Sequence, residues 1–300
     1  MSTGQQILPR AVISAVEGYI GNPIANITST SGGFSHTVVC ADVAPFGRVV
    51  IKAASDDEKR HEIRSEGSML RLLGGAVQAP KIHAMVESDD WTVELVDFLP
   101  GINGLQFVQD VTTVQSMVCA LAGVLARVHR HFDDQMHAPG VAYTHVSPTS
   151  SFRRVALGLE AIPLRPDQRI ALQLAARAVE SSTYAPCLIH GDAGLHNILW
   201  SKADGMCGLL DWEWSGLGNP QLDLAWLRWT LAWRALDTHW PAAFEAYTSV
   251  GGRATLPHAD FLSSLVCAQI AMILVRSKAN QAATHEWLRR LDWTLARALE

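Results

Sequence analysis

Three polar residues in the second half of the chain have the types and the spacing that phosphoryl transfer requires. Asp192 and Asn197 stand five residues apart in one polar run, and Asp211 follows Asn197 by fourteen residues. An aspartate on a loop can take a proton from a hydroxyl, whereas an asparagine carbonyl and a second carboxylate offer oxygen ligands to a hard cation. Little else is needed, because a phosphoryl group in transfer has to be positioned and its charge neutralised. The ordered trio therefore predicts Asp192 as the catalytic residue and Asn197 and Asp211 as magnesium ligands.

The elements around the trio are predicted to be short strands with loops. The apolar runs at 187–189 and 208–210 each end in a polar cluster, which is typical of a strand followed by a loop. Upstream, residues 26–99 contain short β-branched runs and one helical stretch at about 56–73 that ends at two glycines. Beyond Pro100 and Gly101 the pattern is mainly helical. These patterns predict an α+β fold with a small β-rich lobe and a larger helical lobe.

The motif H-G-D-x-x-x-x-N at 190–197, followed by D-W-E at 211–213, resembles the aminoglycoside phosphotransferase and choline kinase-like family, a branch of the protein-kinase-like fold. The segments at 125–129 and 216–225 are similar to the family's as well, so that the resemblance spans about residues 20–230. It looks closest to bacterial members of unassigned substrate. The resemblance implies an enzyme that moves the γ-phosphate of ATP, or of GTP, with magnesium, to a hydroxyl of a small molecule.

The two-lobe fold that the resemblance implies sets the predicted domain boundary at residue 99. A nucleotide-binding lobe occupies 1–99, with a hinge at about 95–101, and a helical lobe occupies 100–300. The catalytic loop at 190–197 and the metal-binding segment at 211–213 then belong to the helical lobe.

The resemblance also implies roles for residues outside the trio. The turn that covers the nucleotide corresponds to Ser31, Gly32 and Gly33, and the phosphate-binding strand lysine with its helix partner corresponds to Lys52 and Glu66. Backbone groups of Asp97 and Leu99 correspond to the adenine contacts of the hinge. His190 and Asp223 are predicted to support the catalytic loop through hydrogen bonds. The candidates for contact with the acceptor are His196, Glu213 and Trp214.

The composition of the chain limits the classes of partner and the location that we expect for the protein. The chain has 300 residues with 24 basic and 29 acidic side chains, a net charge of −5, which argues against nucleic acid or an acidic membrane surface as the main partner. Its five cysteines are scattered and odd in number, which indicates reduced thiols and a cytoplasmic protein. The N-terminal residues do not have the pattern of a signal peptide, and the longest apolar stretch, 261–275, is broken by polar residues, so we expect no membrane span.

Two questions stay open at this point: whether the protein transfers a phosphoryl group at all, and to which acceptor. A nucleotide-binding pseudokinase that acts as a sensor would have the same fold, although it would ordinarily lack the lysine, the base or the metal aspartate. The acceptor could be an aminoglycoside, a macrolide, a choline-like compound, a sugar, an amino acid or another compound with a hydroxyl group. The sequence does not indicate the oligomeric state.

Overall fold

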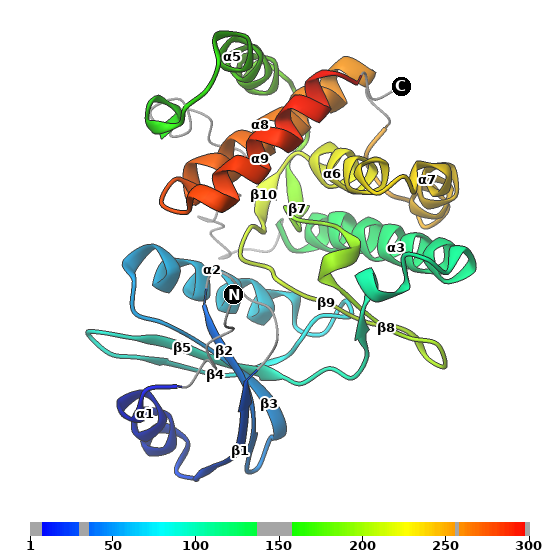
Figure 1. Ribbon diagram of the computed structural model, residues 1–300. Coiled ribbons are helices and arrows are strands. Elements are labelled where there is room, and N and C mark those ends of the chain that lie inside the picture. The colour runs from blue at the N-terminus through cyan, green and yellow to red at the C-terminus, as the bar shows by residue number, and fades with distance from the viewer. Residues whose placement is uncertain (1–7, 30–35, 137–157, 256–257, 298–300) are drawn as a thin grey trace. The chain divides into compact units, whose positions relative to one another are not determined.

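The computed structural model describes residues 8–29, 36–136, 158–255 and 258–297, of which 131–136 are described as helix without their side chains (Figure 1). These residues form two compact units. The first unit comprises the chain up to Asn103 together with Ile198–Glu213, and the second comprises Gly104–Asn197 and the chain from Trp214 onwards. The segment Ile198–Glu213, which lies beyond the predicted boundary at residue 99, therefore packs with the first unit.

The first unit is built on an antiparallel sheet. Its strands are β1 (Ile24–Ser29), β2 (Thr37–Val43), β3 (Gly47–Ala54), β4 (Ile82–Glu87) and β5 (Thr92–Asp97), in the order β1-β2-β3-β5-β4. A smaller sheet joins β6 (Ile102–Asn103), β8 (Ile198–Ser201) and β9 (Gly205–Leu209) in the order β6-β8-β9. The pairing of β6 with β8 brings the end of the hinge segment to the strand that follows Asn197.

Two helices cover opposite faces of the five-stranded sheet (Figure 1). Helix α1 (Arg10–Ile20) buries Val12 and Val16 in a cluster with the strand residues Val49, Ile51 and Leu95. Helix α2 (Asp57–Leu73) begins at Asp56, whose side chain accepts two backbone N–H groups, and ends at a left-handed Gly74. Side chains alternate along a strand, so the residues of β3 and β5 that neighbour Val49, Ile51 and Leu95 in sequence point to the opposite face of the sheet, towards α2. That face carries Lys52 and Glu94, which are directly opposite in the β3–β5 register.

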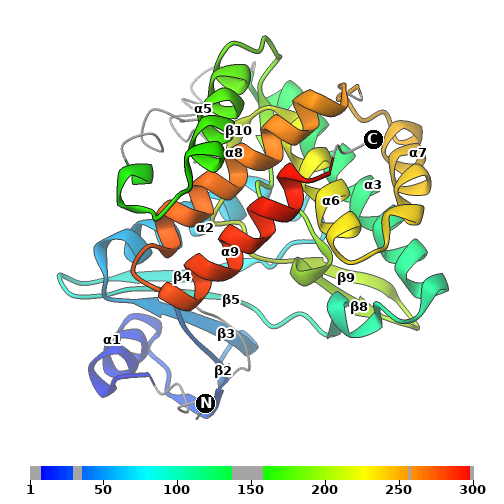
Figure 2. The ribbon, with the colours of Figure 1, turned by 45° about the horizontal axis from the view of Figure 1, so that its top comes forward.

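The second unit is mainly helical. Its helices are α3 (Val111–Met136), α5 (Pro166–Glu180), α6 (Pro220–Trp233), α7 (Trp240–Ser249), α8 (Ala259–Ser277) and α9 (Gln281–Leu295). Short 3-10 turns are η1 (Gly104–Phe107), η3 (Leu159–Ala161), η4 (Leu195–Asn197) and η5 (Asp237–His239), and the strands β7 (Cys187–Ile189) and β10 (Gly216–Gly218) pair antiparallel. Helix α8 lies at the centre and packs against α5, α6 and α9 (Figure 2).

Two helical stretches of this unit, Val111–Arg130 and Ala259–Ser277, are long and apolar enough to cross a membrane. Both are about half buried against other helices, α3 against α7 and α8 against α5, α6 and α9. A core helix has the same composition, because a helix enclosed by protein is apolar around most of its circumference. The packing of α3 and α8 is that of core helices.

Candidate active site

In the first unit, Lys52 on β3 and Glu66 on α2 form a largely buried ion pair, with 2.5 Å between Lys52 Nζ and Glu66 Oε2. Burial disfavours the charged lysine, but the charges of Glu66, Glu94 and Asp211 together outweigh this effect and raise the pKa of Lys52 above its ordinary value. The second oxygen of Glu66 accepts the backbone N–H of Trp212 at 3.3 Å. One glutamate thus connects the strand lysine to the segment that carries Asp211.

A second buried glutamate, Glu94, lies beside this pair. Its Oε1 is 3.8 Å from Lys52 Nζ, and its side chain has no exposed surface. Burial, and then the charge of Glu66, raise the pKa of Glu94 well above its usual range, whereas Lys52 keeps Glu66 ionised with a lowered pKa despite its burial. Lys52 therefore lies beside two buried glutamates whose pKa values are shifted in opposite directions. Sequence reasoning did not single out Glu94, because a lone acidic residue in a strand carries no motif.

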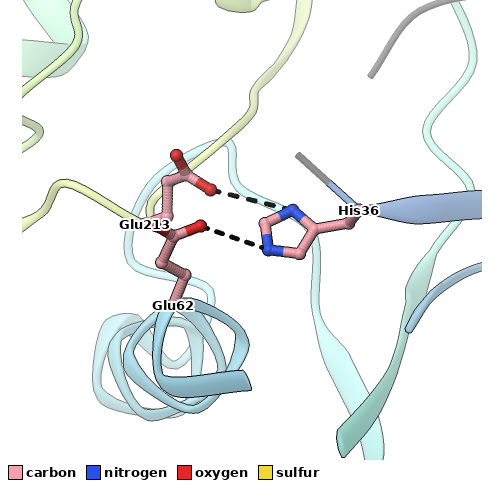
Figure 3. Close-up of side chains that lie close together, drawn as sticks. All are labelled: His36, Glu62 and Glu213. Atoms are coloured by element: carbon pink, nitrogen blue, oxygen red, sulfur yellow. Dashed lines mark ion pairs between the residues drawn. The ribbon is translucent and has the colours of Figure 1, made fainter. Parts of the chain in front are cut away.

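One turn of α2 before Glu66, the helix and the predicted metal segment meet at His36 (Figure 3). His36 Nε2 lies 3.4 Å from Glu62 on α2, and His36 Nδ1 lies 3.8 Å from Glu213. One oxygen of each carboxylate and one ring nitrogen come within 4.8 Å of one another, as in a metal site. However, each ring nitrogen faces a different carboxylate, and one ion cannot bind both nitrogens of an imidazole. The ring is therefore placed as a bridge between two chain segments.

Asp211, the predicted metal ligand, follows β9 in the first unit. Its backbone is left-handed, with φ of 65°, a conformation that a non-glycine residue adopts at a cost. The next residue, Trp212, is fully buried and donates its indole N–H to Leu209 O at 2.9 Å. This bond and the one from Trp212 N to Glu66 Oε1 fix the turn, so that the strained residue is held by its neighbours.

In the second unit, the loop after β7 is anchored by Asp223 of α6, whose side chain is completely buried. Asp223 Oδ2 accepts the backbone N–H of His190 and Oδ1 that of Gly191, both at 2.8 Å. His129 of α3 approaches Oδ2 at 3.0 Å, and Tyr247 holds the other nitrogen of His129 at 2.8 Å. Gly191 has a positive φ of 83°, and a Cβ there would collide with the carbonyl oxygen of Trp214. The sequence predicted the anchoring role of Asp223 but gave no role to His129.

The carboxylate of Asp192 on this loop is surrounded by donors. Oδ2 accepts from Asn197 Nδ2 at 3.0 Å and from His196 Nε2 at 3.1 Å, and Oδ1 accepts from the indole N–H of Trp226 at 2.7 Å. Burial alone would raise the pKa of Asp192, but the charge and hydrogen bond of His196, with smaller contributions from His190 and Trp226, lower it below its usual value. Asp192 is thus held as a carboxylate.

Two neighbours of Asp192 have further contacts that define their roles. Asn197 directs its amide nitrogen at Asp192, which leaves its amide oxygen as the atom that could ligate a cation. His190 is buried, and its Nδ1 accepts the backbone N–H of Asp192 at 3.2 Å. Since that nitrogen is an acceptor, His190 supports the loop.

Trp226 was not predicted as a site residue, since the helical spacing of the tryptophans favoured core packing. It lies three residues after Asp223 on α6, and residues at this spacing share a helix face. The sequence signal that could have identified Trp226 is therefore its spacing of three residues from Asp223, the predicted anchor of the loop. Trp214, the tryptophan that was predicted to reach the acceptor, lies under the Arg276 guanidinium at 4.2 Å from the ring centre and is nearly buried.

The predicted hinge residues lie at the end of β5. The backbone N–H of Asp97 donates to Lys81 O at 2.9 Å, and its side chain lies 2.7 Å from His83 Nε2. Leu99 is half-buried against Gly208 of β9. Ser31, Gly32 and Gly33, predicted to cover the nucleotide, lie outside the described residues.

Residues 26–264 of the chain match the phosphotransferase enzyme family known as APH. The chain is 28% identical over 225 residues to the viomycin phosphotransferase of Streptomyces vinaceus, a match that covers 68% of this chain and 73% of that protein.

Solved structures of similar fold cover nearly the whole chain. One is a mutant aminoglycoside 2′-phosphotransferase-IIIa with GDP, at a TM-score of 0.70 and 17% identity over 95% of this chain and 97% of that one. Another is a mutant APH(4)-Ia with AMP-PNP and hygromycin B, with a TM-score of 0.69 and 14% identity; the match covers 96% of this chain and 98% of that one. A third is the macrolide 2′-phosphotransferase MphH of Brachybacterium faecium, with a TM-score of 0.64 and 16% identity; the match covers 95% of this chain and 98% of that one. The predicted kinase-like fold, with a β-rich and a helical part, is thereby confirmed.

Proposed function

The chain belongs to the phosphotransferase enzyme family, and we propose that Asp192 is the base with which this enzyme prepares its acceptor. The enzyme is a small-molecule kinase, and the group that receives the phosphoryl is a hydroxyl. Lys52, Asp192 and Asp211 are all present, and nothing among the described residues favours the pseudokinase alternative.

The observation that carries this proposal is the set of donors around Asp192. A base must be ionised before the reaction, and three hydrogen bonds to its carboxylate, from Trp226, His196 and Asn197, keep it so. In the transfer, the acceptor oxygen forms a bond to phosphorus, the bond from phosphorus to the nucleotide's bridging oxygen breaks, and the hydroxyl proton passes to Asp192. The leaving group is a nucleoside diphosphate.

We assign nucleotide binding to the first unit. Lys52, held by Glu66, provides the positive charge that its phosphates require, and the N–H of Asp97 is already bonded, so a contact of Asp97 with the base would use its carbonyl. Leu99 and the turn at Ser31, Gly32 and Gly33 complete the predicted set. Nucleotides occupy the similar structures described above, as GDP in one and AMP-PNP in another, which supports a nucleoside triphosphate here, ATP or GTP.

Asn197 and Asp211 fit the needs of magnesium, because each offers a hard oxygen ligand of the type that this ion prefers. The amide oxygen of Asn197 is oriented by the bonds of its nitrogen, and the strained backbone of Asp211 is fixed by the buried Trp212. Magnesium, when bound, neutralises the charge that develops on the phosphate oxygens. The residues themselves contribute orientation: Asn197 also holds Asp192.

For the acceptor, we propose a hydroxylated antibiotic-like compound. The relatives are a viomycin phosphotransferase and, by structure, a macrolide phosphotransferase and an enzyme with bound hygromycin B. His196 touches Asp192 and is the best placed of the three predicted acceptor residues, whereas Glu213 faces His36 and Trp214 faces Arg276. A cytoplasmic location is consistent with five free cysteines.

The test is turnover of ATP and of GTP with magnesium against viomycin, hygromycin B, kanamycin, a macrolide, choline and sugars. Asp192→Asn should lose roughly 10²-fold or more in acceptor-dependent turnover. It should keep nucleotide binding, seen as stabilisation of about 2.7 kcal/mol at a ligand concentration of 100 times Kd. Asp260→Asn, an exposed residue of α8, is the matched control and should behave as the wild type. Near-full activity of Asp192→Asn would refute the assignment.

A further inference from the structure

Among the described residues, the indole of Trp226 makes the shortest hydrogen bond to the carboxylate of Asp192, at 2.7 Å from Nε1 to Oδ1. Trp226 is 2% exposed, so water does not compete for this bond. A hydrogen bond from a buried donor to a charged acceptor is among the stronger ones in a protein. The bond therefore has more weight in placing Asp192 than an exposed contact would have.

The two oxygens of Asp192 are used unequally. Each carboxylate oxygen has two lone pairs. Oδ2 accepts from both His196 and Asn197, whereas the single donor to Oδ1 among the described residues is Trp226. Oδ1 is therefore the oxygen with room for another proton donor. An acceptor hydroxyl that approaches this carboxylate meets it at Oδ1, next to the indole.

Trp226 is itself held rigidly. Its ring stacks on Trp229 at 4.7 Å between centroids and on Trp287 of α9 at 6.1 Å, with interplanar angles of 19° and 21°. Asp223, which anchors the backbone of the catalytic loop, lies one turn earlier on the same helix. One face of α6 thus fixes both parts of the loop: Asp223 holds its backbone and Trp226 holds its acidic side chain.

We propose that Trp226 is a positioning residue for phosphoryl transfer, which orients Asp192 so that its Oδ1 faces the acceptor hydroxyl. This inference rests on the proposed role of Asp192 as the base. A structural role alone would be satisfied by the ring, whereas the inferred role needs the N–H group. The two can be separated, because phenylalanine keeps an aromatic ring and lacks the donor.

The chain supplies a matched control. Trp229, the next tryptophan of α6, is also buried and also donates its indole N–H, to Thr294 Oγ1 at 2.8 Å. Trp226→Phe and Trp229→Phe therefore each remove one buried indole hydrogen bond from the same helix. Trp226→Phe should lower kcat by about tenfold, the equivalent of one charged hydrogen bond. The KM for nucleotide should be unchanged, and Trp229→Phe should change neither kcat nor that KM.

A second measurement needs no acceptor. In the indole region of the 1H–15N spectrum, the resonance lost in Trp226→Phe identifies the Trp226 N–H. In Asp192→Asn that resonance should move strongly, since its charged partner is gone, and the Trp229 resonance should stay. Should Trp226→Phe prove too unstable to assay, this measurement uses the wild type and Asp192→Asn, with Trp226→Tyr for the assignment.

The outcomes separate this inference from the proposed function. Equal kcat values of Trp226→Phe and Trp229→Phe, or a Trp226 resonance that Asp192→Asn leaves in place, would overturn the role of Trp226 while Asp192 remains the base. Near-full activity of Asp192→Asn would overturn both. A tenfold loss confined to Trp226→Phe, with nucleotide KM kept, supports the inference.

Discussion

Replacing Asp223 by asparagine tests how much the catalytic loop depends on one buried carboxylate. Asp223 accepts the N–H groups of His190 and Gly191, both at 2.8 Å, and faces His129 at 3.0 Å. Asparagine keeps one accepting oxygen and replaces the other by an NH2 group, which cannot accept. At least one loop N–H is then left buried without a partner, and the remaining bonds lose their charge. An unsatisfied buried donor costs about 1–3 kcal/mol, and a hydrogen bond whose acceptor changes from charged to neutral weakens by about 1 kcal/mol. We therefore expect the free energy of unfolding to fall by roughly 3 kcal/mol or more.

The assay is thermal unfolding of the second unit together with steady-state kinetics. For a unit of this size, 3 kcal/mol corresponds to a decrease in Tm of roughly 6–12 °C. The loop that carries Asp192 shifts when its anchor is removed, and misplacement of a reacting group by about 1 Å can cost on the order of 10²-fold in kcat. Asp260→Asn, at an exposed position in the first turn of α8, should change Tm little. A variant Asp223→Asn that melts with the control and keeps its kcat would contradict this account of the anchor.

Three further results are expected. Glu94→Gln should be more stable than the wild type by a margin that grows above about pH 4.5, because folding raises the pKa of Glu94 and the wild type therefore loses stability as the pH rises towards that pKa. The measurement is urea unfolding at pH 5 and at pH 8, with the exposed Glu58→Gln as control. A stability margin that is the same at both pH values would contradict this prediction. Lys52→Met should destabilise the first unit by about 3–5 kcal/mol and weaken nucleotide binding, since Glu66 loses its buried partner; unchanged unfolding and nucleotide affinity would be the contrary result. Chelation with EDTA should abolish turnover and added magnesium should restore it, whereas turnover that survives chelation would exclude the metal role of Asn197 and Asp211.

Much of the candidate site could be predicted from the sequence because its members lie in short local patterns. Asp192 and Asn197 share one run of eight residues, 190–197, and such spacing is visible without a fold. Lys52 after a β-branched run and Glu66 in a helical stretch were assigned through the family resemblance that the catalytic motif carries. The helix at 56–73 was predicted within a residue, because Asp56 and Gly74 are strong start and stop signals.

The domain boundary illustrates the limit of local patterns. A change from β-rich to helical composition at Pro100 suggests that everything after it belongs to the helical lobe. The strands β8 and β9 and the segment with Asp211 instead pack in the first unit, where β8 pairs with β6. Strand pairing between residues nearly a hundred positions apart leaves no trace in composition, since it depends on which edges are brought together in space.

By itself, the sequence determined the kind of chemistry, the order of the motif residues and the class of fold, since these depend on residue types at short spacing. The tertiary structure alone decided which other side chains contact the motif residues and set their positions and pKa values. Trp226 is 34 residues from Asp192 and His129 is 94 from Asp223, and Glu94 meets Lys52 across two strands. These contacts depend on burial, which makes a single N–H or carboxyl group decisive, and on the packing of separate helices and strands. A tryptophan in an apolar helix has the same sequence signature whether its indole bonds to a threonine or to a catalytic aspartate.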